Sequence, residues 1–353
     1  MTVPARLVFE RWTHPVAGER LDDSRRFTVE QLDIAGPPAA GWDLLREAHG
    51  YQVAIRTACA QVPNGEQWLA GRSLIERCEN LLAVTSAGAG YDVIDVAACT
   101  EAGVIACNNS GPGAEAVAEH ALGLMLALAK KIVVSDRAMR IAEIKDRTPL
   151  RSSELLGKTL GVVGFGAIGR RLVELCEPFR LAVLVHDPFV SEQTLVEAGV
   201  TRVSFDELLD RSDYVQVTCP LTPETMGLFG SDAFTKMRDT AHFITTARGE
   251  VHDEQALVEA LASGSIAGAG VDVFHTEPVP TDHPLLQLPN VIATPHVAGI
   301  TDEATHGLAV ATAEQWIEIF AGRVPDRLIN PAAWPHYQDR FESVFGFRPD
   351  DLP

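Results

Sequence analysis

Three ionisable residues in the second half of the chain have side chains suited to acid–base chemistry, and each follows a short apolar run. Arg248 closes ITTARG, Glu277 lies in FHTEP just after GVDVF, and His296 lies in TPHVAG after NVIA. An arginine fork can hold a carboxylate, a histidine can donate and retrieve a proton, and a nearby glutamate favours the imidazolium form. Taken one at a time, each also has a structural interpretation: a solvated surface charge, a loop acid before proline, or a structural histidine.

A glycine-rich segment between a strand-like run and a helical pattern has the spacing of a dinucleotide-binding loop. Gly164, Gly166 and Gly169 fit G-x-G-x-x-G, with Ala167 and Ile168 inside the pattern. The first glycine permits a tight turn, the second lets the backbone approach a pyrophosphate, and the third allows close packing of helix and strand. We therefore expect a pyrophosphate at the helix N-terminus, where free N–H groups and the helix dipole favour anions.

The next strand-like run, LAVLVHD, ends in Asp187, 18 positions after Gly169. An acid at this position is expected to accept a hydrogen bond from a ribose 2′-hydroxyl and to repel a 2′-phosphate. Pro188 and Phe189 follow, with no arginine to accommodate NADP, so the segment predicts NAD as the cofactor. The alternative, a turn acid at a strand end, is disfavoured by the glycine loop that precedes it in register.

The elements that must position these residues follow from an alternation of short apolar runs and helical patterns, which predicts parallel sheets built from βαβ units. In the first third of the chain, predicted strands at 6–10, 51–56, 81–86 and 104–109 alternate with predicted helices at 39–49, 64–78 and 91–102. A second series has strands near 158–163, 181–187, 213–219, 242–247, 268–274 and 290–294, and a helix follows at 301–322. The chain is therefore predicted to be α/β, with two Rossmann-like, doubly wound parallel sheets. Its 353 residues suffice for two domains.

A long apolar helix is predicted between the two series, from Gly113 to about Arg140. Its apolar residues recur at helical spacing: Val117, Ala121, Leu124, Met125, Leu128 and Ile132. Because its flanks are apolar as well, we expect it to be buried between domains or subunits, with a plain core helix as the alternative.

Composition and charge exclude several classes of function. The net charge of −19 with unclustered basic residues argues against nucleic acid and anionic membrane surfaces as partners. The six cysteines form no CxxC pair and show no metal-ligand spacing, so we expect reduced thiols and no metal site. The first residues lack the long apolar core of a signal peptide, and the run 121–129 is too short to span a bilayer. We expect a soluble, cytoplasmic protein.

Over residues 80–330 the sequence resembles the D-2-hydroxyacid dehydrogenase family, in its NAD-dependent, phosphoglycerate and glycerate dehydrogenase-like branch. The resemblance rests on a series of segments in family order: SAGAGYDVID (86–95), AVAEHALGLMLAL (116–128), GKTLGVVGFGAIGR (157–170), CPLTPET (219–225), TARGEVHDEQAL (246–257), GAGVDVFHTEP (268–278) and NVIATPHVAG (290–299). His252 departs from the family, because relatives usually have an apolar residue there. The tail 331–353 has no counterpart that we can place, and the segment 139–156 lacks a Gly-x-Trp found in many relatives.

The resemblance implies that Arg248, Glu277 and His296 converge in a catalytic site, with His296 as the acid/base, Glu277 tuning it and Arg248 binding the substrate carboxylate. It implies further cofactor contacts beyond the glycine loop and Asp187, at Thr218, Cys219, Pro220, Thr225, Thr246, Ala247, Asp272 and Gly299. Asp272 is expected to contact the nicotinamide carboxamide. Ala89 and Gly90 are expected to offer backbone N–H groups to the substrate carboxylate, with a simple tight turn as the alternative. Arg56, at the end of YQVAIR, resembles an arginine that binds a distal anion, with an ion pair to an acidic neighbour as the alternative.

The family resemblance implies a substrate-binding domain formed by 1–110 and 299–353, with an NAD-binding Rossmann domain at 111–298 inserted in it. It implies interconversion of a (R)-2-hydroxy acid and its 2-keto acid by a homodimer that uses NAD. Two alternatives stay open. One is a nucleotide-sensing, corepressor-like scaffold of the same fold, and the other is a formate-type dehydrogenase, which the presence of Glu277 disfavours. The identity of the acid and the physiological direction stay open as well.

Overall fold

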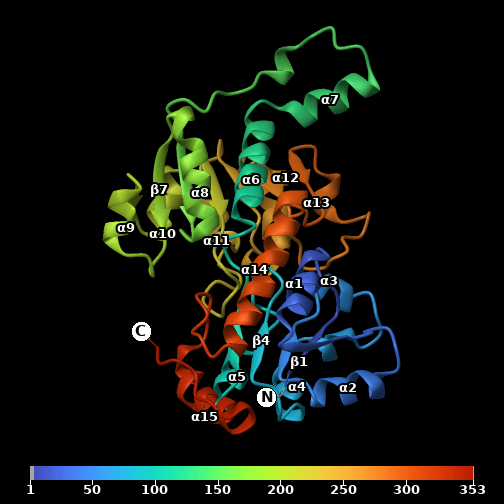
Figure 1. Ribbon diagram of the computed structural model, residues 1–353. Helices are drawn as coiled ribbons and strands as arrows, with labels where there is room; N and C mark the ends of the chain where they lie inside the picture. The colour runs from blue at the N-terminus through green and yellow to red at the C-terminus, as the bar shows by residue number, and fades with distance from the viewer. Residues whose placement is uncertain (1–3, 353) are drawn as a thin grey trace. The chain divides into compact units, whose positions relative to one another are not determined.

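The structure is a computed structural model and describes residues 4–352 (Figure 1). Internal contacts divide the chain into two compact units, Met1–Gly113 with Thr301–Pro353, and Ala114–Ile300, which we call unit 1 and unit 2. Each unit contains one parallel sheet with helices on both faces, so the predicted α/β class with two parallel sheets is confirmed. No helix within 4–352 combines the length and the apolar character needed to cross a membrane.

Unit 1 is built on a five-stranded parallel sheet with the order β2-β1-β3-β4-β5. Its strands are β1 (Ala5–Phe9), β2 (Phe27–Gln31), β3 (Gly50–Gln52), β4 (Ala83–Thr85) and β5 (Ile105–Cys107). Successive side chains alternate between the two faces, as the pleat requires. Leu7 and Ile105 pack in one buried cluster, and the residues that follow them, Val8 and Ala106, pack in the other. Both faces are therefore covered, as expected for an all-parallel sheet.

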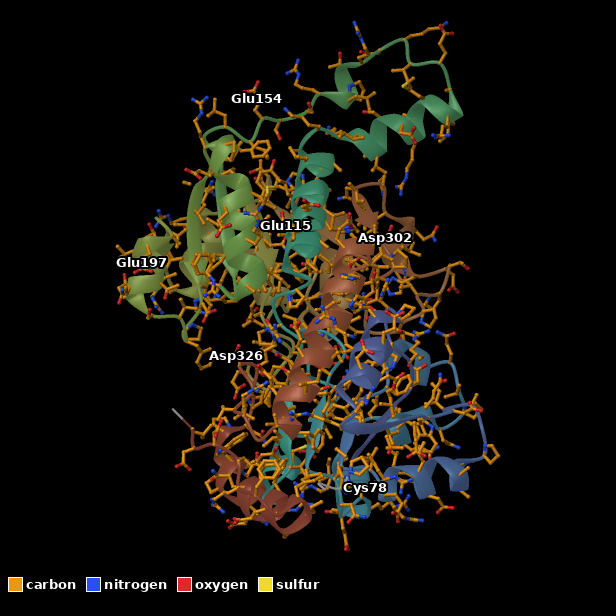
Figure 2. The ribbon with its side chains drawn as sticks, viewed as in Figure 1. Cys78, Glu115, Glu154, Glu197, Asp302 and Asp326 are labelled. Atoms are coloured by element: carbon orange, nitrogen blue, oxygen red, sulfur yellow. The ribbon has the colours of Figure 1, made fainter. Side chains whose placement is uncertain are left out.

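The helices of unit 1 form two layers. One buried cluster contains side chains of α2 (Pro38–Arg46), α3 (Arg56–Cys59), η1 (Gly65–Trp68), α4 (Arg72–Arg77) and α5 (Val96–Glu101). The other contains side chains of α1 (Val16–Ser24), α14 (Asp302–Phe320) and α15 (Trp334–Phe345), which follows η5 (Pro331–Ala333). Asp302, labelled in Figure 2, begins α14 directly after the cap, where the Thr301 side chain accepts a hydrogen bond from the Ala304 N–H.

The C-terminal tail forms helix α15 and completes the core of unit 1. Trp334, Tyr337 and Phe341 recur at helical spacing and are buried against α14, where Phe341 lies against Phe320. Arg340 donates hydrogen bonds to the carbonyls of Ala102, at the C-terminus of α5, and Gly103. The segment for which the sequence offered no placement is thus a packed part of the first unit.

Unit 2 is built on a seven-stranded parallel sheet with the order β12-β11-β10-β9-β6-β7-β8. Its strands are β6 (Thr159–Val163), β7 (Ala182–His186), β8 (Thr201–Arg202), β9 (Tyr214–Val217), β10 (His242–Thr245), β11 (Gly268–Val271) and β12 (Val291–Ala293). The order changes direction between β6 and β9, the kind of switch point at which open α/β sheets bind ligands.

Helices cover both faces of this second sheet. One buried cluster joins α6 (Ala114–Ala129), α8 (Ala167–Cys176) and α9 (Glu192–Glu197) to the sheet. The other joins α10 (Phe205–Arg211), α11 (Ser231–Lys236), α12 (Glu254–Ser263) and α13 (Pro284–Gln287) to it. The remaining elements are α7 (Ile132–Ile141), η2 (Thr148–Leu150), η3 (Glu177–Phe179) and η4 (Gly249–Val251). Glu115 at the start of α6, labelled in Figure 2, accepts hydrogen bonds from Arg171 of α8.

The single helix predicted from Gly113 to Arg140 is wrong, because two helices occupy this stretch. α6 ends at Ala129, Lys131 adopts a left-handed backbone with φ 51°, and α7 leaves at an angle (Figure 1). A left-handed residue interrupts the helical hydrogen-bond ladder, which apolar periodicity does not register. The apolar face of α6 is buried as expected, but Ile132 of α7 is 55% exposed.

The predicted strand 51–56 is also too long. β3 ends at Gln52, and Arg56 begins α3 instead of closing a strand. The edge strands β2 and β8 were not predicted. β2, with the sequence FTVEQ, is largely polar because an edge strand is partly exposed.

Candidate active site

The predicted site residues of unit 2 gather at the carboxyl edge of its sheet. In a parallel sheet the residues that directly follow neighbouring strands share one edge. Here those residues are Gly164 after β6, Asp187 after β7, Thr218 after β9, Thr246 after β10, Asp272 after β11 and Thr294 after β12.

The three glycines of the loop have the three geometries that dinucleotide binding requires. Gly164 has φ 91°, and a Cβ there would lie 2.5 Å from the Cys219 nitrogen. A Cβ on Gly169 would lie 2.5 Å from the Gly164 carbonyl oxygen, so helix α8 and strand β6 could not approach as they do. A Cβ on Gly166, the N-cap of α8, would meet nothing within 4 Å. The space at Gly166 and the N-terminus of α8, which begins with Ala167 and Ile168, fits a pyrophosphate group.

The other predicted cofactor positions of unit 2 support this loop or line the same edge. Thr218 donates a hydrogen bond from Oγ1 to the Gly164 carbonyl at 2.6 Å, and Cys219 is buried beside it. Thr225 donates to the Pro220 carbonyl at 2.7 Å. Thr246 Oγ1 accepts a hydrogen bond from Gln216 Nε2 at 3.1 Å, with Ala247 next to it at the end of β10, and Gly299 follows the His296 turn.

Asp187 is held by the glycine loop itself. Its Oδ2 accepts a hydrogen bond from the Phe165 N–H at 2.7 Å, and its Oδ1 accepts one from the Phe189 N–H at 2.9 Å. Pro188 and Phe189 follow Asp187 without an arginine, but Arg202 of β8 donates a hydrogen bond to the Asp187 main-chain carbonyl at 2.7 Å. The Arg202 guanidinium also forms an ion pair with Glu192, so it links the turn after β7 to helix α9. A surface hollow of about 440 Å³ lies beside Asp187 and Arg202.

The side chains of His296 and Glu277 are hydrogen-bonded to each other. His296 Nδ1 donates to Glu277 Oε2 at 2.8 Å, and the Phe274 N–H donates to Glu277 Oε1 at 3.0 Å. Burial acts to raise the pKa of the Glu277 carboxyl, but His296, the Phe274 N–H and the charge of Arg248 outweigh it and lower that pKa. Because Nδ1 is committed to the carboxylate, Nε2 is the ring atom left for proton transfer.

The backbone of His296 is strained. Its φ of 55° lies in the left-handed region, which costs a residue other than glycine on the order of 1 kcal/mol. The His296 N–H donates to the Asp272 carbonyl at 2.7 Å, and this bond helps to hold the turn. Strain retained beside a paired imidazole is typical of a functional site.

Arg248 lies close to this pair. It precedes η4, its Nη1 donates to the Ala247 carbonyl at 2.7 Å, and its charge is among those that lower the Glu277 pKa. The next residue, Gly249, packs so tightly that a Cβ there would lie 2.1 Å from the Phe274 carbonyl carbon. The segments that carry Arg248, Glu277 and His296 are therefore brought together within unit 2.

The three predicted substrate residues of unit 1 lie at or after the ends of β3 and β4. Arg56 Nη2 lies 2.6 Å from Asp92 Oδ2, and the Asp92 side chain is 7% exposed. The ion pair considered as the alternative for Arg56 is thus present. Ala89 is exposed and its carbonyl accepts a hydrogen bond from Asn108 Nδ2 at 2.9 Å, while Gly90 is half-buried in the same turn.

The sequence of unit 2 matches a known family over half of the chain. Residues 122–298 match the family model described as "D-isomer specific 2-hydroxyacid dehydrogenase, NAD binding domain". The chain belongs to the D-2-hydroxyacid dehydrogenase family. The resemblance noted in the sequence is thereby confirmed.

Relatives within this family differ in what they are named for. A D-3-phosphoglycerate dehydrogenase of Archaeoglobus fulgidus is 36% identical over 308 residues, 87% of this chain and 56% of that protein. The chain spans about half the length of the phosphoglycerate dehydrogenases it matches. A glyoxylate reductase of Korarchaeum cryptofilum is 36% identical over 260 residues, 73% of this chain and 78% of that protein. Among solved structures, D-lactate dehydrogenase of Aquifex aeolicus, in complex with NAD and lactic acid, has a TM-score of 0.75 and 27% identity, covering 90% of this chain and 96% of that one.

Three residues near the candidate site were not predicted from the sequence. They are Arg202 behind Asp187, Thr294 beside Asp272, and His120 of α6, whose Nε2 lies 3.0 Å from Thr294 Oγ1. The signal for Thr294 was available, because it follows a strand as Asp272 does. Arg202 and His120 had no such signal, since both reach the site from elsewhere in the chain. Among the described residues, no three His, Cys, Asp or Glu side chains are grouped to hold a metal ion.

Proposed function

We propose that the protein is an NAD(H)-dependent oxidoreductase that interconverts a (R)-2-hydroxy acid and its 2-keto acid. The observation that carries this proposal is the hydrogen-bonded His296–Glu277 pair, with the charge of Arg248 close by. The pair stands at the same sheet edge as a glycine loop whose geometry fits a dinucleotide. Family membership supports the same reaction class.

The residues divide the chemistry as follows. When bound, NAD supplies or accepts the hydride at the substrate carbon. The Arg248 fork binds the substrate carboxylate and polarises the adjacent carbonyl. His296 Nε2 donates a proton to the carbonyl oxygen in reduction and removes it in oxidation, and Glu277 keeps the ring oriented and stabilises the imidazolium.

Cofactor contacts are assigned to the carboxyl edge of the unit 2 sheet. The open space at Gly166 receives the pyrophosphate, and Asp187 accepts from the adenosine ribose, which favours NAD over NADP. The remaining contacts are proposed at Thr218, Cys219, Pro220, Thr225, Thr246, Ala247, Asp272 and Gly299.

Unit 1 is assigned to the substrate. The proposed boundaries, 1–110 with 299–353 for substrate and 111–298 for NAD, fall within a few residues of the two compact units. Ala89 and Gly90 are proposed to bind the substrate carboxylate through backbone N–H groups. Arg56 is proposed to contact a polar or anionic group at the far end of the acid, in equilibrium with its ion pair to Asp92.

We also propose a homodimer in the cytoplasm. Exposed apolar side chains on α7, Ile132, Met139 and Ile141, suit a contact with a second copy. All six cysteines are buried and unpaired, which suits a reducing compartment.

Turnover with a panel of acids tests the proposal. NADH oxidation is followed with glyoxylate, hydroxypyruvate, phosphohydroxypyruvate, pyruvate and longer 2-keto acids. We expect at least one acid to support a kcat of about 1 s⁻¹ or more. A chain that binds NADH but reduces none of them would instead be the corepressor-like scaffold of the same fold.

A further inference from the structure

Two polar residues lie side by side behind the His296 turn because of strand register. β11 and β12 pair in parallel with Val271 opposite Ala293, so the next residues of each chain segment, Asp272 and Thr294, are neighbours. Thr294 Oγ1 lies 2.6 Å from Asp272 Oδ1. Nε2 of His120 on α6 lies 3.0 Å from the same hydroxyl oxygen and 3.8 Å from Asp272 Oδ1.

The direction of each hydrogen bond in this series is fixed by chemistry. A carboxylate can only accept a hydrogen bond, so the Thr294 hydroxyl donates its single hydrogen to Asp272. The hydroxyl oxygen can then only accept from His120, so His120 carries its proton on Nε2. The series therefore runs from His120 Nε2–H to Thr294 O–H to Asp272 Oδ1.

Asp272 also accepts hydrogen bonds from the backbone of the turn that carries His296. Its Oδ1 accepts the Val297 N–H at 3.0 Å and its Oδ2 accepts the Ala298 N–H at 3.0 Å. Its main-chain carbonyl accepts the His296 N–H at 2.7 Å. The Asp272 side chain is 1% exposed, so solvent cannot replace a lost partner. A carboxylate held at both oxygens thus sets the path of the left-handed turn at His296, whose φ is 55°.

We propose that Thr294 and His120 are positioning residues for the acid/base His296, an inference that rests on the function proposed above. Glu277 orients the imidazole ring, while the series His120–Thr294–Asp272 fixes the backbone from which the ring projects. Without the Thr294 hydroxyl, the Asp272 carboxylate can rotate and move the N–H groups of Val297 and Ala298 with it. His296 Nε2 then leaves the position needed for proton transfer, although no group of the reaction has been removed.

The first test compares Thr294→Val, which keeps the side-chain shape, with Thr294→Ser, which keeps the hydroxyl. With the best 2-keto acid and NADH, we expect Thr294→Val to lower kcat by roughly 10- to 100-fold and Thr294→Ser by less than about threefold. KM for NADH should rise by a smaller factor than kcat falls in both, since the glycine loop is untouched and only the proposed contact of Asp272 with the cofactor is affected. Wild-type kcat in Thr294→Val, or equal losses in the two variants, would overturn the proposal.

His120→Phe tests the series from its other end and keeps a ring on α6. We expect it to lower kcat by roughly tenfold alone, and by less than about twofold more when added to Thr294→Val, because both act through one carboxylate. Losses that multiply would show that the two residues do not act in series. If Thr294→Val does not fold, His120→Phe alone must still lower kcat, and an unchanged kcat overturns the proposal.

A measurement without turnover separates this inference from the proposed function. The protein is labelled with ¹⁵N-histidine, and the ring signals of His296 are assigned by their loss in His296→Gln. We expect these signals to shift or broaden in Thr294→Val and to stay in place in Thr294→Ser. Unchanged signals in Thr294→Val overturn the positioning role. Full turnover by His296→Gln with shifted signals in Thr294→Val would instead overturn the acid/base role and leave the positioning intact.

Discussion

At the scale of single residues, the two ring nitrogens of His296 have different tasks in the proposed reaction. Nδ1 is bonded to Glu277, whose carboxyl pKa is lowered largely through His296 against the opposing effect of burial. The carboxylate lies against the ring nitrogen that does not face the substrate in the proposed reaction, so it orients the imidazole and places a negative charge beside it. The proposed reduction uses the imidazolium as proton donor, so we expect its pH range to depend on Glu277.

Glu277→Gln should lower the alkaline limit of the pH range in which the protein reduces its substrate. The neutral amide cannot stabilise the imidazolium, so reduction fails at a lower pH than in the wild type. We expect the ratio of kcat/KM at pH 6 to that at pH 8.5 to rise by roughly tenfold. Stopped-flow NADH oxidation across pH 5.5–9.5 provides the measurement. If the alkaline limb of the pH profile of kcat/KM lies at the same pH in Glu277→Gln as in the wild type, Glu277 does not set the pH range of reduction.

Asp187→Asn should weaken the preference for NAD. The amide oxygen can still accept the Phe165 N–H that the carboxylate holds at 2.7 Å, so the glycine loop keeps its support while the charge is removed. Losing the repulsion of a 2′-phosphate should reduce the NAD/NADP ratio of kcat/KM by roughly 10- to 100-fold. A wild-type protein that prefers NADPH would contradict the assignment of Asp187.

The sequence predicted most of the residues that follow strands, with Thr294 as an exception, and it missed the residues that reach the site from distant parts of the chain. Arg248, Glu277 and His296 were found because each closes a recognisable apolar run. Arg202 stands 15 positions from Asp187 and His120 stands 174 positions from Thr294, and both separations depend on how the sheet and helices pack. For Arg56 the sequence allowed an ion pair as an alternative, but only the structure identifies Asp92 as the partner.

At the scale of elements, the segment between β10 and α12 carries a buried histidine that the sequence marked as unusual. His252 is 1% exposed, and neither ring nitrogen has a hydrogen-bond partner among the described residues. Burial lowers the pKa of His252 to about 4, with smaller effects of Glu254, His275, Asp253 and His283 around it. The ring is therefore neutral in the folded protein near neutral pH, as an apolar side chain would be.

His252 should make the folded protein sensitive to acid. The pKa of His252 is lower in the folded than in the unfolded protein. His252 therefore does not change the free energy of unfolding above about pH 6.5, and it lowers that free energy progressively as the pH falls toward 4. At pH 4 the loss amounts to roughly 3 kcal/mol. We expect His252→Phe, which fits beside Phe243, to remove this part of the pH dependence.

Urea unfolding at pH 8 and pH 5 measures the effect. His242 is also buried with its pKa lowered to about 4, so the wild type and the variant share one source of acid sensitivity. The informative quantity is the difference between wild type and His252→Phe at each pH. Equal losses of unfolding free energy between pH 8 and pH 5 in both proteins would contradict the account.

Element boundaries were the least predictable feature of the fold. Apolar spacing predicted α6 correctly but ran across Lys131, because a left-handed residue leaves no trace in hydrophobic periodicity. β2 was missed because its edge position permits polar residues, and α15 was missed because its aromatic residues stand among prolines and charges. The buried strands of both sheets were predicted because each belongs to a short, continuous apolar run.

At the scale of the whole molecule, the two parallel sheets and the family were predictable from the order of the motifs. The substrate was not, because relatives with similar identity are named for phosphoglycerate and for glyoxylate. We expect a few side chains to decide the substrate of this chain, and Arg56, which forms an ion pair with Asp92, is one candidate.

Arg56→Ala distinguishes the two interpretations of that arginine. If Arg56 contacts a distal polar or anionic group, KM for hydroxypyruvate or phosphohydroxypyruvate should rise by roughly tenfold, and KM for pyruvate by less than about twofold. Steady-state kinetics with the three acids at saturating NADH provide the comparison. Equal changes, or none, would leave Arg56 as the ion-pair partner of Asp92 alone.

The most direct test of the central claim is the turnover of His296→Gln with the best 2-keto acid and saturating NADH. Glutamine keeps a polar side chain at the end of the strained turn but cannot donate a proton from an imidazolium. We expect kcat to fall by roughly 10²- to 10⁴-fold, with NADH affinity and thermal stability close to wild type. A His296→Gln variant that reduces the acid at the wild-type rate would contradict the claim that His296 is the proton donor.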